Sequence, residues 1–243
     1  MCRFDIVRNR KELIATTQER AGSDVIELGV PFSDPLADGG TIQKANTDAL
    51  NNGVTLKDCL NYVKDARSKG FHTPVVLMGY YNPFMQYGEE KIVKECQEVG
   101  VHGLIVVDLL FDEAESLLSL CEKYKINFIP LIAPTSTDDR IAKIAKIASG
   151  YVYCVSLTGV TGARTELPKD LKDFISRVKK YISLPIAIGF GLSTRTHFLS
   201  VGKLADGAVM GSAIVKRAAM DGDDIKASAK RIESFVTSVV KGD

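Results

Sequence analysis

The sequence predicts an α/β protein, a (β/α)8 TIM barrel in which parallel strands alternate with helices. Short apolar runs of strand length alternate along the chain with stretches of helical spacing, which is typical of parallel strands joined by crossovers. The connections are short, and no linker, low-complexity tract or charge block interrupts them. With 243 residues, 45% of them hydrophobic, the chain suits one large core. We therefore expect a single domain over residues 1–243.

Strand number decides between an open sheet and a closed barrel. Seven strand candidates are clear in the sequence. The eighth, at residues 3–7, is short, weakly alternating and flanked by arginines, and a predicted helix from about 10 to 20 follows it. Eight strands would close the barrel, and we expect the first to be missing or irregular. A doubly wound sheet is the alternative, but no GxGxxG follows the first strand, which disfavours a dinucleotide fold. The seven other strand candidates are residues 24–28, 75–79, 103–108, 127–132, 151–155, 186–189 and 207–210.

Helical spacing is clearest at Ile141, Ile144, Ala145 and Ala148, whose positions follow the pattern i, i+3, i+4 and i+7. Thr137 supplies a capping residue before this helix. The predicted helices that follow the second strand cover residues 56–69, 89–99, 112–124, 137–148, 167–181, 193–201 and 224–240.

Composition excludes several function classes. A formal net charge of +1 gives no electrostatic reason to expect nucleic-acid or membrane binding, and no apolar run reaches transmembrane length. The charged first 14 residues lack the apolar stretch of a secretory signal. Five scattered cysteines without CxxC spacing predict reduced thiols in a cytoplasmic protein. The three histidines have no metal-ligand spacing, so we expect no metal site.

A carboxylate lies inside the apolar strand that begins at residue 24. Strand alternation places Val25 and Glu27 on one face and the flanking apolar residues on the other. A buried carboxylate is costly unless it is paired, neutralised or used. We consider Glu27 a candidate acid or base, with a core-edge salt bridge as the alternative.

The loop after this strand carries two more acids, Asp34 and Asp38, and leads to a helix with Thr41 as candidate cap. An acid just beyond a strand end can converge on the carboxylate inside the strand, as a pair of acid/base groups requires. Asp-Pro and Asp-Gly are also ordinary turn sequences, so a plain turn role for both acids stays open. Asp108, after the 103–108 strand, is expected to cap the next helix.

Glycine clusters follow the last three strands, at 156–162 (SLTGVTG), 189–191 (GFG) and 211–212 (GS). Glycine lets backbone N–H groups approach an anion, and 211–212 also opens a helix, whose N-terminus favours phosphate. Such barrels often hold phosphate beyond strands seven and eight. The clusters predict a phosphorylated substrate, with ordinary turns as the alternative.

Several blocks occur in order between about residues 22 and 216: ELGVPFSDPLADG, VVLMGYYNP, LIAPTSTDDRI, GVTGA, GFGLSTR and GSAIVK. In these blocks the chain resembles the tryptophan synthase alpha chain. The sequence of the blocks is most similar to the fungal forms, in which the alpha domain is typically fused to the beta domain. The resemblance implies a lyase of tryptophan biosynthesis, which cleaves indole-3-glycerol phosphate to indole and glyceraldehyde 3-phosphate by a retro-aldol reaction. It also implies a beta chain or fused beta domain as partner. This chain would need no metal or organic cofactor, and pyridoxal phosphate would belong to the beta partner.

The resemblance also implies roles for individual residues. Glu27 matches the family's catalytic acid/base, and Asp38 matches the aspartate that binds the indole N–H and stabilises the protonated ring. Thr161 matches a loop threonine that contacts Asp38. The remaining matches concern substrate binding: Tyr153 beside the two acids, Gly162, Gly191, Gly211 and Ser212 around the phosphate, and Phe190, Met78 and Ile105 along the indole pocket.

The sequence departs from the family pattern in four places. The strand resembling VTYVTAGYP near the N-terminus is absent, Gly40 replaces a proline, Leu157 replaces an arginine, and Leu110 replaces a proline in the segment that faces the beta partner. These departures motivate the alternative of a catalytically weak alpha-type chain that binds and regulates a beta partner. A related phosphate-binding isomerase or indoleglycerol-phosphate synthase, and a truncated product without function, are further alternatives.

Overall fold

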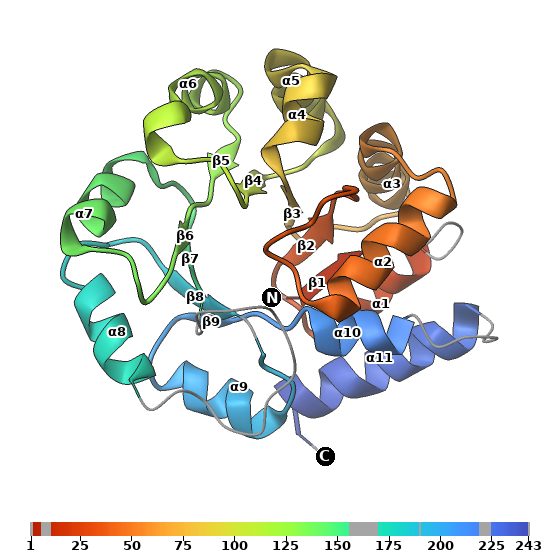
Figure 1. Ribbon diagram of the computed structural model, residues 1–243. Coiled ribbons are helices and arrows are strands. Elements are labelled where there is room, and N and C mark those ends of the chain that lie inside the picture. The colour runs from red at the N-terminus through yellow and green to blue at the C-terminus, as the bar shows by residue number, and fades with distance from the viewer. Residues whose placement is uncertain (1, 6–10, 156–169, 190, 219–224, 243) are drawn as a thin grey trace.

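The computed structural model describes residues 2–5, 11–155, 170–189, 191–218 and 225–242, with side chains from residue 15 onwards. In Figure 1 the helices form a ring around the strands, in the alternating order that the sequence predicts. The alternation of helices with parallel strands confirms the predicted α/β class, and the ring of helices around the strands (Figure 1) is that of a (β/α)8 barrel.

The strands form two parallel sheets in the orders β1-β2-β3-β4-β5 and β6-β7-β8-β9. Within each sheet, every strand pairs with the next one along the chain, as in a barrel wall. Their bounds are β1 Cys2–Asp5, β2 Ile26–Gly29, β3 Val75–Gly79, β4 Gly103–Val106, β5 Asn127–Phe128, β6 Leu131–Ile132, β7 Val152–Val155, β8 Ile186–Gly189 and β9 Gly207–Ala208.

The helices connect the strands on the outside. Their bounds are α1 Lys11–Ala21, α2 Gly40–Asn51, α3 Leu56–Ser68, α4 Tyr81–Tyr87, α5 Glu89–Val99, η1 Phe111–Glu113, α6 Glu115–Lys123, α7 Asp138–Ile147, α8 Leu171–Val178, α9 Arg195–Gly202, α10 Ser212–Ala218 and α11 Ile225–Val240. Short α4 was not predicted. Helix 112–124 is divided into η1 and α6, and of the predicted helix 167–181, residues 167–169 lie outside the described residues.

The first strand is present, so the expectation that it would be missing or irregular is wrong. β1 pairs in parallel with β2, with Cys2 opposite Ile26, and α10 packs against β1. Consequently β2 is not left at an edge. The strand predicted at 127–132 is divided because Pro130 has no N–H to donate. Ile129 donates to Leu104 and Pro130 accepts from Tyr153, so this residue pair joins the two sheets.

Apolar side chains fill two regions, one inside the barrel and one between the barrel and its helices. Ile26 and Leu28 belong to the outer region, whereas Val25 belongs to the inner one, so the predicted alternation of β2 is confirmed and Glu27 faces the barrel interior. The inner region comprises Val76, Met78, Ile105, Ile129, Tyr153, Val155, Ala187 and Val209.

Loops at the N-terminal ends of the strands are fixed by Arg67 of α3. Its guanidinium donates to the carbonyl oxygens of Phe71 (3.0 Å), Thr73 (2.8 Å) and Gly100 (2.9 Å). Glu19 of α1 accepts from the N–H groups of His72 (2.8 Å) and Thr73 (2.7 Å). Two helix–strand connections, α3–β3 and α5–β4, are thereby joined to each other and to helix α1 at this end of the barrel.

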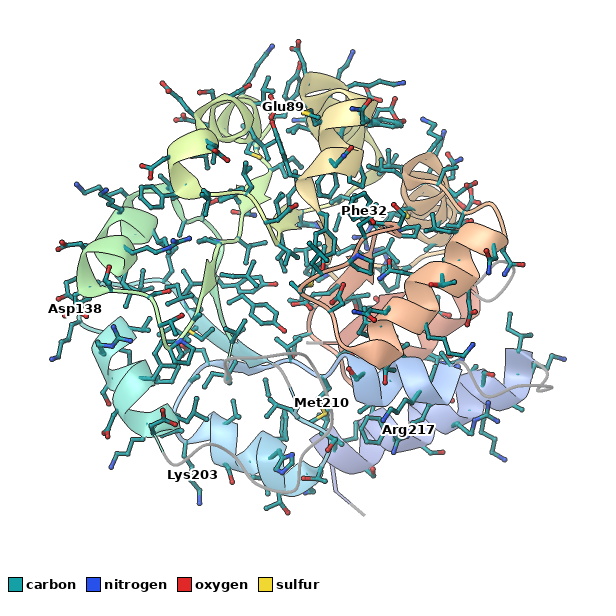
Figure 2. All side chains as sticks on the ribbon, in the orientation of Figure 1. Phe32, Glu89, Asp138, Lys203, Met210 and Arg217 are labelled. Atoms are coloured by element: carbon teal, nitrogen blue, oxygen red, sulfur yellow. The ribbon has the colours of Figure 1, made fainter. Side chains whose placement is uncertain are left out.

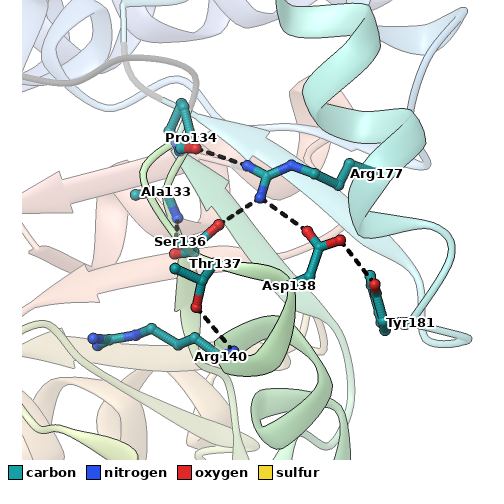
Figure 3. Close-up of polar contacts among 8 residues, drawn as sticks. All are labelled: Ala133, Pro134, Ser136, Thr137, Asp138, Arg140, Arg177 and Tyr181. Atoms are coloured by element: carbon teal, nitrogen blue, oxygen red, sulfur yellow. Dashed lines mark hydrogen bonds and ion pairs between the residues drawn. The ribbon is translucent and has the colours of Figure 1, made fainter.

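At the opposite end, Arg177 of α8 holds the loop between β6 and α7 (Figure 3). It donates to the carbonyl oxygens of Pro134 (2.7 Å) and Ser136 (2.6 Å) and to the carboxylate of Asp138 (3.2 Å). Hydrogen bonds from Tyr181 and Arg177 lower the pKa of Asp138 below its ordinary value. Thr137 accepts from the N–H of Arg140, which confirms it as the cap of α7.

Candidate functional site

Glu27 is the second residue of β2 and is completely buried. Its register partner on β3 is Val76, whose side chain belongs to the apolar interior. The carboxylate therefore lies inside the barrel among apolar side chains, where an ionisable group is costly unless it is stabilised or used.

Tyr151, just before β7, donates its hydroxyl to Oε1 of Glu27 at 3.4 Å. Burial and the nearby Glu27 carboxylate raise the pKa of Tyr151 far above its ordinary value, so the phenol stays protonated and remains a donor. The sequence interpretation missed Tyr151. It lies two residues before Tyr153, and strand periodicity places both on the same face, so this signal was available.

Asp38 lies on the loop between β2 and α2 and is only 3% exposed. The hydroxyl of Tyr80, directly after β3, donates to Oδ2 of Asp38 at 3.2 Å and accepts the N–H of Ala37 at 2.9 Å. Tyr80 is also buried, so the carboxylate and its donor are held together away from bulk solvent. Sequence interpretation missed Tyr80 too, although it lies inside the block VVLMGYYNP at a strand end.

The Asp38 loop is fixed by further hydrogen bonds. Asn46 accepts from the N–H of Phe32 (3.1 Å), and the side-chain amide of Gln43 donates to the carbonyl of Asp38 (2.8 Å). Asp34 is exposed, and its contacts with the described residues are those of a turn: its carbonyl accepts from Leu36, and its carboxylate from Ser33. The N–H of Asp38 also closes a turn, on the carbonyl of Pro35, but its carboxylate is buried against Tyr80, so a role beyond the turn stays a prediction for Asp38.

The N-cap of α2 is Gly39, not Thr41, which lies inside the helix. The loop thus ends two residues earlier than expected, directly after Asp38. This places Asp38 next to the helix start, where the free N–H groups and the dipole favour negative charge.

Tyr153 of β7 is buried and lies against Gly189 of β8. A Cβ at residue 189 would overlap the Tyr153 ring and hydroxyl, so the tyrosine can occupy this place only beside a glycine. Met78 and Ile105 are register partners on β3 and β4, and both are buried in the same interior region as Tyr153. The structure therefore brings these three predicted residues together on the inner wall.

The predicted phosphate residues are only partly described. Gly191 has φ +83°, a left-handed backbone that favours glycine. Gly211 directly precedes α10, and its carbonyl accepts from Ile214 and Val215 of the first turn. Ser212 is the first residue of α10. Thr161, Gly162, Phe190 and the departure at Leu157 lie outside the described residues.

The described strand-end residues all belong to one end of the barrel. Asp38, Tyr80, Gly191 and Gly211 each follow the C-terminal end of a parallel strand, the end at which barrels of this kind place their active sites. Helix α2 packs against α10 through Ile42, Ala45 and Val215, so the Asp38 loop and the Gly211 turn lie on neighbouring elements. In Figure 2, Phe32 and Met210 lie toward the middle of the ring, whereas Glu89, Asp138 and Lys203 lie on its outside.

Four of the five cysteines belong to the described residues. Cys59, Cys96, Cys121 and Cys154 are free and buried, and burial raises the pKa of Cys154 to about 12, so it is an unreactive thiol. Over the described ranges, no three His, Cys, Asp or Glu side chains are grouped as a metal ion would require. None of the described helices is long and apolar enough to cross a membrane.

Known proteins match this chain over most of its length. The family profile "Tryptophan synthase alpha chain" matches residues 4–242. The tryptophan synthase alpha chain of Roseiflexus castenholzii is 48% identical over 202 residues, which cover 83% of this chain and 77% of that one. The tryptophan synthase of Saccharomyces cerevisiae is 50% identical over 195 residues, which cover 80% of this chain but only 28% of the yeast protein.

Solved structures of tryptophan synthase are also similar to this chain over nearly its whole length. A mutant tryptophan synthase alpha-subunit from Pyrococcus furiosus has a TM-score of 0.89 and 33% identity, covering 99% of this chain and 97% of that one. The alignment to a tryptophan synthase complex from the same organism has a TM-score of 0.88, 33% identity and the same coverage. With a family match over nearly the whole length, this chain belongs to the tryptophan synthase alpha chain family.

Proposed function

We propose that this chain cleaves indole-3-glycerol phosphate to indole and glyceraldehyde 3-phosphate in tryptophan biosynthesis, with Glu27 and Asp38 as its catalytic residues. The observation that carries the assignment of roles is the placement of two buried carboxylates. Glu27 lies inside the barrel on β2, and Asp38 lies at the C-terminal end of the same strand. Each accepts a hydrogen bond from a tyrosine, Tyr151 and Tyr80 respectively.

The retro-aldol reaction needs three things from these side chains. C3 of the indole must gain a proton, the adjacent side-chain hydroxyl must lose one, and the ring nitrogen must be stabilised while it carries positive charge. Glu27 donates to C3 and accepts the hydroxyl proton as the C3–carbon bond breaks and the aldehyde forms. Asp38 accepts the indole N–H and stabilises the cationic ring. General acid–base groups of this kind each contribute about 10²- to 10⁴-fold.

The rest of the substrate would occupy the neighbouring residues. Met78, Ile105 and Tyr153 offer an apolar wall for the indole ring. Gly191, Gly211 and Ser212 would bind the phosphate with backbone N–H groups at the end of the barrel where phosphate sites commonly lie. Thr161, Gly162 and Phe190 complete this proposed set.

We propose that the reaction uses no cofactor in this chain and that pyridoxal phosphate belongs to the beta partner. Proton transfer by carboxylates is sufficient for a retro-aldol cleavage of this substrate. The partner is a tryptophan synthase beta chain or fused beta domain, supported by the similarity of this chain to solved tryptophan synthase complexes from Pyrococcus furiosus. We also propose a cytoplasmic location, in keeping with the free thiols of the four described cysteines.

The test is the release of indole from indole-3-glycerol phosphate by the purified chain, with and without a beta chain. We expect equal amounts of indole and glyceraldehyde 3-phosphate, at a rate that rises with the partner. Folded protein that activates the beta chain but releases no indole would contradict catalysis and favour the regulatory alternative. An isomerised or cyclised product instead of indole would indicate a related barrel enzyme.

A further inference from the structure

The start of α4 depends on a carboxylate from another strand. Its N-cap residue, Tyr80, makes no capping hydrogen bond with its own side chain, and its first turn contains no acidic residue. Pro83 in this turn has no N–H. The N–H of Tyr81, the first helical residue, instead donates to Oδ1 of Asp108 at 2.6 Å. A carboxylate at this position satisfies a free N–H and is favoured by the helix dipole.

Asp108 reaches α4 because the pairing of β3 with β4 continues past both strands. The backbone N–H of Val107 donates to the carbonyl of Gly79 at 2.9 Å. The next donor on this side is the N–H of Tyr81, two residues after Gly79, and it meets the side chain of Asp108, one residue after Val107, instead of a backbone acceptor. The sequence-based expectation that Asp108 caps the helix after its own strand is therefore wrong, because it caps the helix after the preceding strand.

Tyr80 lies between this cap and the candidate catalytic aspartate. Its backbone leads directly into the capped N–H of Tyr81, while its hydroxyl bonds both Asp38 and the N–H of Ala37. Its ring also packs against Phe32, with centroids 5.4 Å apart. Because the tyrosine side chain is long and rigid, a shift of its backbone moves the hydroxyl that contacts Asp38.

We propose that Asp108 is a positioning residue for the lyase reaction: by holding the first turn of α4, it holds Tyr80 in the orientation that places Asp38 for the indole nitrogen. This inference rests on the proposed function of Asp38. Asp108 itself touches neither Asp38 nor substrate in this account, and it acts through Tyr80. Asp108 is exposed, so it can be replaced without opening a cavity in the core.

The test is a double-mutant cycle on kcat for indole release by the isolated chain. We expect Asp108→Ala to lower kcat about three- to tenfold, as the loss of a cap would allow, with a smaller change in KM. Asp108→Asn keeps an acceptor and should retain most of kcat. In a Tyr80→Phe background, Asp108→Ala should change kcat less than about twofold, because the contact through which it acts is already absent. If Asp108→Ala lowers kcat by the same factor in the Tyr80→Phe background as in the wild-type chain, the proposal is overturned.

A matched control removes a capping carboxylate elsewhere. Asp58 caps α3 by accepting from the N–H of Thr55 at 2.9 Å, and helix α3 bears none of the candidate site residues named above. Asp58→Ala should lower stability as Asp108→Ala does, yet leave kcat unchanged. A loss of kcat in Asp108→Ala that appears only with the beta chain present would assign Asp108 to the subunit interface instead, and so would contradict positioning.

A second measurement keeps the inference testable if the chain releases no indole. The chain is labelled with ¹³C at the tyrosine Cζ, and the Tyr80 resonance is assigned with Tyr80→Phe. Asp108→Ala should shift this resonance, which reports on the phenol hydrogen bond, whereas Asp58→Ala should not. An unmoved Tyr80 resonance in a folded Asp108→Ala protein would refute positioning, whereas absent turnover in wild type alone would refute only the proposed function.

Discussion

The two ends of this barrel differ in what their charged side chains do. At the N-terminal end, Arg67 and Glu19 bond mainly to backbone groups of connecting loops. The C-terminal end has a loop-fixing residue as well, Arg177, but it also bears the buried carboxylate of Asp38, and Glu27 lies deeper on the strand that leads to it; both carboxylates face tyrosine hydroxyls. The first arrangement fixes loops that bear no candidate site residue. The second keeps carboxylates in an environment where proton transfer is sensitive to small changes. We infer that stability and chemistry are separated along the barrel axis, as is typical of this fold.

The strongest challenge to this separation is Asp38→Asn. The amide removes the charge but still offers an oxygen to the Tyr80 hydroxyl, so the loop should stay in place. We expect kcat for indole release to fall about 10²- to 10⁴-fold, while thermal unfolding changes little. A fall in kcat of less than about tenfold would indicate that Asp38 is a turn residue without a catalytic role.

A second test concerns the contact between the two strands that carry Tyr153 and Gly189. Gly189→Ala places a Cβ where the Tyr153 hydroxyl lies, so the ring must move. We expect kcat/KM to fall about 10- to 100-fold and stability to fall by about 1–3 kcal/mol. Gly207→Ala on β9 is the control, because its Cβ would lie an ordinary 3.5 Å from Ala187. Equal effects of the two variants would contradict a special role for the Tyr153 contact.

A substitution at the N-terminal end of the barrel should lower stability and leave kcat nearly unchanged. Arg67→Ala removes a guanidinium that donates to three carbonyl groups, so unfolding by urea should show a loss of about 2–4 kcal/mol. At temperatures where the variant is folded, kcat should stay within about twofold of wild type. Lys64→Ala, an exposed cation on the same helix, should change neither quantity. A large loss of kcat in folded Arg67→Ala protein would break the proposed separation of the two ends.

Replacing Glu19 should have the smallest effect on stability, and this effect should depend on pH. Burial alone would raise its pKa, but hydrogen bonds from His72 and Thr73 together lower it. A carboxyl with a lowered folded pKa stabilises the protein above its unfolded pKa of about 4.3, and this contribution is lost as pH falls through the folded value. Glu19→Gln should cost less than about 1 kcal/mol at pH 7. The two stability curves should converge on acidification, and a constant difference down to pH 3 would contradict this assignment.

Much of the fold follows from sequence because each strand is a local apolar pattern. The alternation around Glu27 was predicted from β2 alone and is confirmed by the inner and outer regions. The cap of α4 by Asp108 depends on pairing between strands far apart in sequence, so local patterns could not predict it. The division at Pro130 follows from a local feature, a proline inside a strand pattern, that the sequence interpretation overlooked. The first strand was underestimated because its pairing with β2 outweighs its weak alternation.

The candidate site was predictable where chemistry marks a residue locally. Glu27 was recognisable as an acid in an apolar strand, and Asp38 as an acid at a strand end. Tyr80 and Tyr151 were missed because an aromatic residue beside a strand most often belongs to the core, although Tyr151 shares a strand face with Tyr153. Only the fold shows that their hydroxyls meet the two carboxylates.

The most direct test of the central claim is the turnover of Glu27→Gln. The amide keeps the size of the side chain and an oxygen for the Tyr151 hydroxyl, but it cannot exchange the proton that the reaction requires. The account predicts that indole release becomes undetectable, while thermal unfolding and the binding of glycerol 3-phosphate stay close to wild type. Near-normal indole release by Glu27→Gln would contradict the assignment of this end of the barrel as the catalytic one.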